Sequence, residues 1–185
     1  STGLLLEMAD YLRLRVKPSR DEAEFKNGVT RLNRRLLEYG ITSAHDAGPS
    51  NGPDRWQTLQ GLQSSGLLSC RIVMMAGASR LQDFRESGLG FGHGDDWLRI
   101  GHAKIMLTMT TGDLYPAPLV LRALVSECHQ ARFPVAIHAV EGEAVTAAAR
   151  ILGDDRFLRD SGDDSTLCDR IEHCSECTTN VLGLV

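Results

Sequence analysis

The feature that most constrains the fold of this sequence is a regular alternation of short apolar segments with longer segments of helical periodicity. The short segments are apolar nearly throughout, as is typical of strands covered on both faces of a parallel sheet. Strands separated by helical patterns are the signature of βαβ units, so the sequence predicts an α/β fold. The predicted strands cover residues 41–45, 68–75, 98–107, 134–139 and 169–173, and the predicted helices cover 2–15, 21–39, 54–65, 118–131 and 141–152.

The length of the chain limits the kind of parallel sheet that it can form. Together with a last apolar segment, 181–185, the pattern gives about six strands in 185 residues. A closed eight-stranded barrel typically needs ~250 residues. We therefore expect either an open sheet or a partial (β/α)8 barrel that lacks its first and last units. The chain is expected to be a single domain, 1–185, with a helical lead-in over 1–39 and βα units over 40–185.

Composition and charge narrow the choice of partners and compartment. The formal net charge is −4, and 24% of the residues are charged, so the sequence argues against a nucleic-acid partner. No apolar stretch reaches the ~18–20 residues of a membrane span, and the first residues lack the features of a secretory signal. Five cysteines are an odd number, which favours reduced thiols. These features favour a cytoplasmic protein.

A lysine stands inside the apolar run 98–107. Burying an unpaired ammonium costs several kcal/mol, so Lys104 must be paired, deprotonated, modified or directed at a polar cavity. His138 and His173 lie near the ends of the next two predicted strands, after intervals of 34 and 35 residues that each fit one βα unit. Because parallel strands place their carboxyl ends at one rim, we expect the three side chains to converge there.

A lysine and two histidines at one rim suggest a metal site, provided that the lysine is not a cation. Reaction of the amine with carbon dioxide gives a carbamate, which is an anionic oxygen ligand. Imidazoles and a carboxylate-like oxygen suit zinc or a similar divalent ion, of which one or two would bind. The alternative is that Lys104 pairs with an acidic residue while each histidine donates to a backbone carbonyl.

Several segments of the sequence match a known family. They are TGLLLE near the start, GITSAHDAG at 40–48, LRIGHAKIM around Lys104, FPVAIHAVEGEAV around His138 and DRIEHCSEC around His173, of which the last three are the more specific. With these segments the chain resembles the amidohydrolase superfamily, specifically the family-3-type metal-dependent hydrolases that include N-substituted formamide deformylases.

The resemblance implies a distorted (β/α)8 barrel in which Lys104 is a carboxylated bridging ligand and His138 and His173 are the histidines of the fifth and sixth strands. It also implies hydrolysis of an amide, formamide or related C–N bond in a small molecule by a metal-activated water. In such enzymes an acidic residue on the last strand orients this water and shuttles its proton.

Two parts of the family pattern do not occur in this sequence. It contains no His-x-His, which the family carries on its first strand, and the catalytic Asp of the eighth strand is not accounted for. We therefore expect the central fragment of a hydrolase, inactive alone. Exposed parallel edges would favour a homo-oligomer. The rival hypothesis is a non-catalytic partial barrel that self-associates without metal.

Polar residues beside the predicted ligands have open roles. His45 and Asp46 end a predicted strand and could line the substrate pocket, or Asp46 could cap a turn while His45 bonds to backbone. His102 points to the same side of its strand as Lys104 and is expected to be a packing residue or to support a ligand. Glu172 should face away from His173 and pair with an arginine.

Two further motifs are weaker. Cys174 and Cys177 form a CxxC that could bind zinc with Cys168 and His173 or could act as a redox pair. No second CxxC is present, and loop or helix-start cysteines are the simpler interpretation. The glycine-rich segment 88–94 precedes a strand instead of following one. It therefore lacks the helix N-terminus of a phosphate loop and is expected to be a surface loop.

Overall fold

A computed structural model describes residues 11–12, 15–16, 21–109, 112–158 and 168–183 of the chain. Most of the helix expected over 2–15 lies outside these residues, as does the end of the apolar segment 181–185. The described part contains one parallel sheet in the order β1-β2-β3-β4-β5. The strands are β1 (Ser43–Asp46), β2 (Arg71–Gly77), β3 (Leu98–Met106), β4 (Val135–Ala139) and β5 (Arg170–His173).

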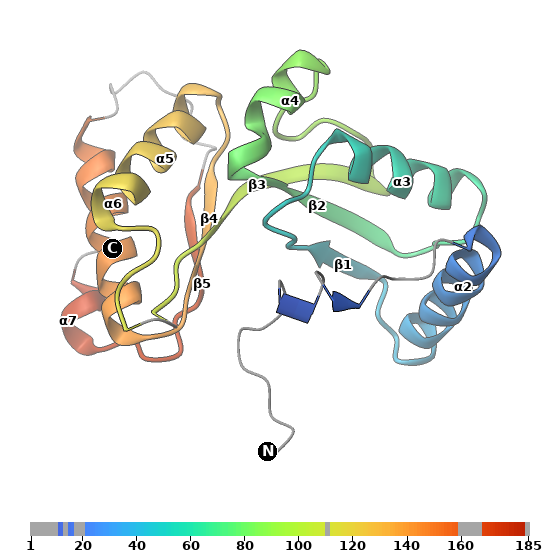
Figure 1. Ribbon diagram of the computed structural model, residues 1–185, viewed down its shortest axis with the longest axis horizontal. Coiled ribbons are helices and arrows are strands. Elements are labelled where there is room, and N and C mark those ends of the chain that lie inside the picture. The colour runs from blue at the N-terminus through green and yellow to red at the C-terminus, as the bar shows by residue number, and fades with distance from the viewer. Residues whose placement is uncertain (1–10, 13–14, 17–20, 110–111, 159–167, 184–185) are drawn as a thin grey trace.

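The sheet is curled, with helices along its convex side (Figure 1). This arrangement confirms the predicted α/β partial barrel, with five strands among the described residues against the expected count of about six. Segment 181–185 begins within a short helix instead of a strand. The helices are α2 (Glu22–Glu38), α3 (Pro53–Ser64), α4 (Leu81–Glu86), α5 (Pro118–Gln130), α6 (Gly142–Leu158) and α7 (Thr179–Leu182), and a 3-10 turn, η1 (Ala78–Arg80), precedes α4.

Local signals in the sequence explain where the helices begin and end. The carboxylate of Asp21 accepts hydrogen bonds from the backbone N–H groups of Ala23 and Glu24, which caps the start of α2. Gly40, with φ of 71°, follows the end of this helix in the left-handed conformation that commonly ends helices. Pro53 and Pro118 occupy first-turn positions of α3 and α5, where no backbone N–H is needed.

The main core lies between the convex face of the sheet and the helices. Met74, Ile100 and Ile137 are 0% exposed and come from β2, β3 and β4. Phe84 from α4 is also fully buried and meets Phe133 edge to face, with ring centroids 6.3 Å apart. Each such side chain contributes ~1.5–3 kcal/mol by leaving water. The alternate residues of each strand therefore face the concave side.

The pairing of β2 with β3 contains a register shift that affects the position of Lys104. Met74 pairs with Ile100, but Ala76 pairs with Ala103, so β3 has one extra residue in this interval. A Cβ atom on Gly101 would lie 2.6 Å from Cγ1 of Val73, which explains the glycine there. Beyond the shift, Lys104 pairs with Gly77 on one side and with Ala136 on the other.

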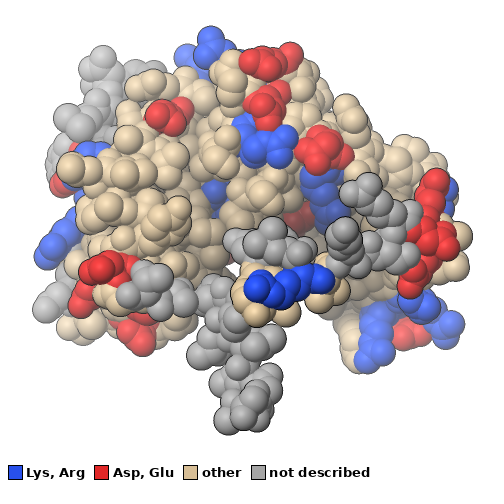
Figure 2. All heavy atoms as spheres, in the orientation of Figure 1, with Lys and Arg blue, Asp and Glu red and all other residues tan. Residues whose placement is uncertain are grey.

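Charged side chains of both signs are interspersed on the face of the molecule that Figure 2 shows. Ion pairs at the surface of the protein include Arg34 with Glu38 and Arg122 with Asp154. None of the helices in the described ranges combines the length and the apolarity that crossing a membrane requires.

Candidate functional site

The three predicted ligands lie toward the carboxyl ends of β3, β4 and β5. Lys104 and His138 belong to the residues that face the concave side, because their neighbours Ala103 and Ile137 pack in the core under the helices. Lys104 pairs with Ala136, which is two residues before His138. His138 is therefore displaced from Lys104 by roughly 7 Å along the strand, toward the carboxyl rim.

His138 and His173 meet at this rim. Their ring centroids are 4.7 Å apart and the rings are inclined at 72°, so one imidazole meets the other edge to face. Simple alternation would not have placed them together, because His173 pairs with Ala139, which packs on the helix side. The left-handed φ of 73° at His173 and of 49° at Cys174 ends the strand with an abrupt turn at this ring.

Lys104 is only 4% exposed, as its apolar surroundings predict. Burial lowers the pKa of its amine, Glu172 acts in the opposite direction through its charge, and Arg170 lowers the pKa further. Among the described residues, no ion pair or hydrogen bond to Lys104 Nζ occurs, so the alternative of a lysine in direct contact with an acid gains no support. Burial thus shifts the protonation equilibrium of this amine toward its neutral form.

A polar cluster beside Lys104 was only partly foreseen from the sequence. Glu172 pairs with an arginine as predicted, since Arg170 Nε lies 2.5 Å from Glu172 Oε1. The same guanidinium reaches across the concave face, where its Nη2 lies 3.2 Å from His45 Nδ1. Sequence reasoning missed Arg170. The spacing of Arg170 and Glu172 by two residues on one strand was the available signal, since such residues share a face.

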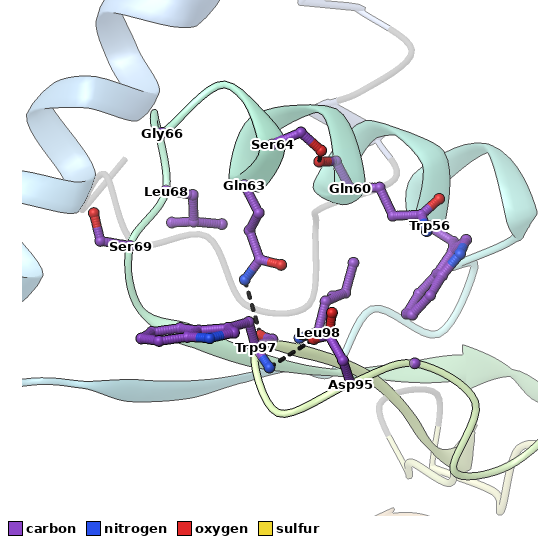
Figure 3. A pocket seen from close by; sticks show the side chains of 11 residues that line it. Trp56, Gln60, Gln63, Ser64, Gly66, Leu68, Ser69, Asp95, Trp97 and Leu98 are labelled. Atoms are coloured by element: carbon purple, nitrogen blue, oxygen red, sulfur yellow. Dashed lines mark hydrogen bonds between the residues drawn. The ribbon is translucent and has the colours of Figure 1, made fainter.

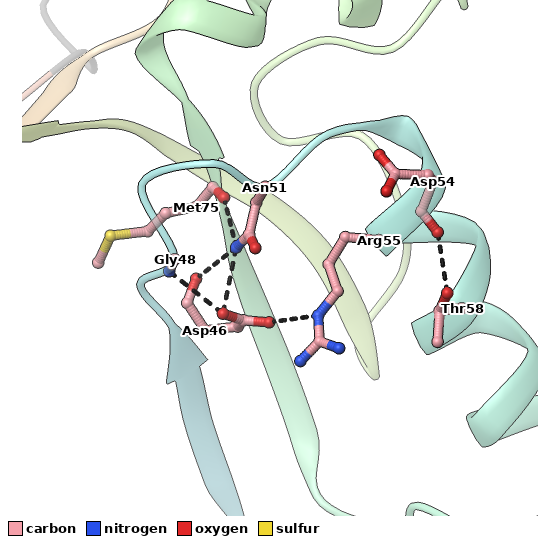
Figure 4. Close-up of polar contacts among 7 residues, drawn as sticks. All are labelled: Asp46, Gly48, Asn51, Asp54, Arg55, Thr58 and Met75. Carbon is pink, nitrogen blue, oxygen red and sulfur yellow. Dashed lines mark hydrogen bonds and ion pairs between the residues drawn. The ribbon is translucent and has the colours of Figure 1, made fainter. Parts of the chain in front are cut away.

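Asp46 organises the loop that follows β1 (Figure 4). Its carboxylate accepts hydrogen bonds from Gly48 N, from Asn51 Nδ2 and from Arg55 Nε, the last at 2.9 Å. Burial alone would raise the pKa of Asp46, but these bonds outweigh it and hold the pKa below its ordinary value. Asp46 thus has the turn-forming role that the sequence left open, and its role toward a substrate stays a prediction.

The remaining candidates have structural partners. His102 Nε2 lies 2.9 Å from the Cys168 carbonyl oxygen, and the ring packs against Phe91. Burial lowers the pKa of this imidazole, which fits the packing role predicted for it. Segment 88–94 is a loop as expected.

The CxxC forms a turn, in which the Cys177 N–H donates to the Cys174 carbonyl oxygen. Within the described ranges, no three His, Cys, Asp or Glu side chains gather as a metal site. This gives the zinc interpretation of Cys174 and Cys177 no support. It also means that a metal held by His138 and His173 would need Lys104 or a further ligand.

A cavity of about 510 Å³ lies at the other end of the sheet, near the start of β2 and β3 (Figure 3). Trp56, Leu68 and Trp97 contribute to its lining. Gln63 Nε2 donates to the Trp97 carbonyl oxygen at 2.8 Å, which ties α3 to the start of β3. In barrels of this type the amino end of the strands serves stability, so we do not assign this cavity to the candidate site.

Comparison with known proteins identifies the family. The family model described as "Amidohydrolase family" matches residues 1–182, so the chain belongs to the amidohydrolase family. This agrees with the resemblance seen in the sequence around Lys104, His138 and His173. No curated protein matched the sequence significantly.

Two solved structures have the same fold over most of this chain. One is an uncharacterized metal-dependent hydrolase from Pyrococcus horikoshii OT3, with a TM-score of 0.66 and 20% identity, and the match covers 88% of this chain and 35% of that one. The other is an uncharacterized metal-dependent hydrolase from Pyrococcus furiosus, with a TM-score of 0.65 and 18% identity, covering 95% and 44% respectively. The chain therefore spans less than half the length of either protein.

Proposed function

We propose that this chain carries part of the metal centre of a hydrolase that cleaves a C–N bond of the amide or formamide type in a small molecule. The proposed ligands of the divalent ion, which we take to be zinc, are Lys104, His138 and His173. The observation that carries the proposal is the meeting of His138 and His173 at the carboxyl rim, with ring centroids 4.7 Å apart. Membership of the amidohydrolase family supports it, as do the two metal-dependent hydrolases of the same fold.

The two histidines suit a shared ion. Imidazoles that bind one zinc ion through nitrogens at ~2 Å have ring centres roughly 5 Å apart, which is close to the separation seen here. Their edge-to-face inclination of 72° is compatible with two nitrogens that converge on one point. A neutral imidazole is also the form that binds metal, and it adds no charge to the rim.

Lys104 would complete the set as a carbamate. A neutral amine attacks the carbon of carbon dioxide, an N–C bond forms, and one proton leaves, so the product carries one negative charge. The low exposure and lowered pKa of Lys104 favour the neutral amine that this reaction needs. The carboxyl group also lengthens the side chain toward the rim where His138 lies. The carbamate would thus account for a buried lysine that no acidic residue contacts in the described part of the chain.

The remaining roles follow from the position of the rim. When bound, the ion supplies a water of lowered pKa as the nucleophile. We propose His45 and Asp46, at the end of β1, as residues that line the substrate pocket. The chain offers no His-x-His and no assigned general base, so we propose that alone it binds metal without turning over substrate.

Five cysteines without disulfides fit a reducing compartment, and we place the protein in the cytoplasm.

Zinc binding by the metal-free chain tests this proposal. Isothermal titration in bicarbonate buffer should show about one or two zinc ions per chain for the wild type, and loss of at least tenfold in affinity for His138→Ala and His173→Ala. The matched control is His93→Ala, because His93 is an exposed loop histidine that contacts the Trp56 ring instead of another imidazole. Zinc binding that survives both rim substitutions unchanged would contradict the proposal.

Carbon-13 bicarbonate gives a separate test of the lysine. A carbamate resonance should appear in the wild type on addition of zinc and should be missing from Lys104→Ala. Retention of the resonance in that variant would show that another amine reacts. Retention of full zinc affinity would show that Lys104 is not a ligand.

A second candidate is a non-catalytic, self-associating partial barrel, which the open edges of the sheet favour. In the sheet that the described residues form, β1 and β5 each pair on one side only, so both present unpaired backbone groups. The apolar residues Phe25, Leu32 and Leu37 of α2 are also exposed, by 46%, 55% and 47%. We propose that a second copy of the chain covers these surfaces. Analytical ultracentrifugation should show a homo-oligomer that Leu32→Lys weakens, and a wild type that stays monomeric at high concentration would refute this.

A further inference from the structure

The two edge strands of the sheet are connected across its concave face. Arg170 is the first residue of β5, and His45 lies near the end of β1. Although these strands are at opposite ends of the sheet order, Arg170 Nη2 lies 3.2 Å from His45 Nδ1. The sheet must therefore curl enough for an arginine side chain to span its interior. The contact therefore links Arg170, on the same strand as the predicted ligand His173, to His45, which is predicted to line the substrate pocket.

The chemistry of this contact determines the state of the His45 ring. A guanidinium has five N–H donors, no acceptor, and stays protonated in proteins. The His45 Nδ1 must then accept the hydrogen bond through its lone pair, so it carries no proton. The proton of the neutral imidazole consequently resides on Nε2. A doubly protonated ring would instead bring an N–H donor and a positive charge against the guanidinium.

Arg170 is itself held in place by Glu172. The Nε of Arg170 lies 2.5 Å from Glu172 Oε1, although the N–H is not directed along this contact, which makes the pair a close ion contact. Glu172 pairs in the ladder with His138, so it stands on the concave side beside the candidate site. Its carboxylate balances the charge of the guanidinium. The guanidinium can therefore remain inside the concave face and face His45.

The other ring nitrogen of His45 is available. In the part of the chain that the structure describes, Nε2 of His45 carries no hydrogen bond, and the residue is exposed. We propose that Arg170 is a positioning residue that holds His45 in the Nε2–H tautomer, so that His45 offers one hydrogen-bond donor to the carbonyl oxygen of an amide-type substrate. The substrate class rests on the function proposed above. The tautomer rests only on the contact between Arg170 and His45.

A fixed Nε2–H donor on His45 would favour substrates that carry a carbonyl oxygen. An amide carbonyl oxygen accepts hydrogen bonds. During hydrolysis negative charge develops on this oxygen, which strengthens the hydrogen bond from a donor that already points at it. The opposite tautomer would present a lone pair to the same oxygen and repel it. Arg170 would thus act through His45 without touching the substrate. If Arg170 only held β1 and β5 together, the affinity for a carbonyl compound would not depend on the tautomer of His45.

Nitrogen-15 NMR of the metal-free chain at about pH 8, where an ordinary imidazole is neutral, tests the tautomer directly. In the wild type, His45 should show a pyridine-type Nδ1 and a pyrrole-type Nε2. In Arg170→Met the two resonances should move toward the averaged values of a mixture. The matched control is Arg122→Met, which removes the ion pair of Arg122 with Asp154 on the helical layer and should leave His45 unchanged. A wild-type His45 with a mixed or reversed tautomer overturns the proposal without the need for any variant.

Titration with N-benzylformamide tests the donor. The wild-type Nε2 resonance of His45 should shift in a saturable way, and the dissociation constant should rise at least tenfold in Arg170→Met. Absence of any shift in the wild type, or an equal affinity in Arg170→Met, overturns the proposal. The zinc titrations of the His138 and His173 variants are separate measurements. If zinc binding fails while His45 still responds to the amide, the metal hypothesis fails and this inference survives.

Discussion

Replacing the buried lysine with methionine should stabilise the metal-free chain. Lys104 is 4% exposed, its pKa is lowered by burial, and no described residue pairs with Nζ. Methionine has a similar length and shape but carries no charge to desolvate. Lys104→Met therefore removes a cost of the folded state while it also removes the proposed carbamate. The same substitution should therefore raise the stability of the metal-free chain and abolish any further stabilisation by bound zinc.

The size of the effect follows from the cost of burying an unsatisfied polar group, ~1–3 kcal/mol and more for a charge. The amine faces the concave side of an open sheet, so we expect a gain of about 1–2 kcal/mol at neutral pH. As a control, Lys26→Met removes an exposed helix pair with Glu22, whose contact is 2.6 Å. Such a pair contributes little, so the control should change stability by less than ~0.5 kcal/mol.

Urea unfolding followed by circular dichroism measures both changes, and the pH dependence adds a second check. The folded pKa of Lys104 lies below its ordinary value of 10.5, so between these two pKa values the unfolded chain binds more protons and wild-type stability rises with pH. The advantage of Lys104→Met should thus be fully present below the folded pKa and should shrink as pH rises toward 10.5. A variant less stable than wild type at neutral pH, or an advantage that grows with pH, would refute the reasoning.

Three further substitutions or labels test the structure around the site. Asn51→Ala should lower the free energy of unfolding by about 2–3 kcal/mol, because Asn51 is 8% exposed and its amide contacts three oxygens; a change within error in urea unfolding would contradict this. Burial raises the pKa of the Cys128 thiol to about 12, so a disulfide reagent at neutral pH should label exposed Cys177 rapidly and Cys128 only on unfolding; equal rates would count against the core. Gly94→Ala should cost more stability than Gly66→Ala in thermal unfolding. Both glycines have positive φ, but the added methyl meets a backbone oxygen at 2.0 Å only at position 94, and equal costs would refute the local packing.

The strands and the fold class could be predicted because apolar periodicity reports burial. The strand predicted over 98–107 is Leu98–Met106, and the strand predicted over 134–139 is Val135–Ala139. The low exposure of Lys104 followed from its apolar neighbours in the same way. Burial on both faces requires apolar residues at nearly every position, so these strands leave a strong signal even without the structure.

The arrangement of the side chains at the rim could not be predicted to the same extent. Alternation alone places His173 on the helix side with Ala139, and only the left-handed backbone at the end of β5 accounts for its meeting with His138. The contact of Arg170 with His45 spans 125 residues of sequence and depends on how strongly the sheet curls. Neither local conformation of this kind nor sheet curvature leaves a periodic signal in one sequence.

The carboxyl rim concentrates features that cost stability. Lys104 is a buried amine, and His173 and Cys174 are two of only three described non-glycine residues with positive φ, the third being Arg132 in a turn. A left-handed residue costs ~1–2 kcal/mol, so the end of β5 stores several kcal/mol that the core must offset. At the amino end of the sheet, by contrast, ordinary contacts such as that of Gln63 tie the elements together. Because natural sequences break local rules chiefly where function requires it, this concentration is a further reason, independent of the ligand, to propose the carboxyl rim as the functional end of the sheet.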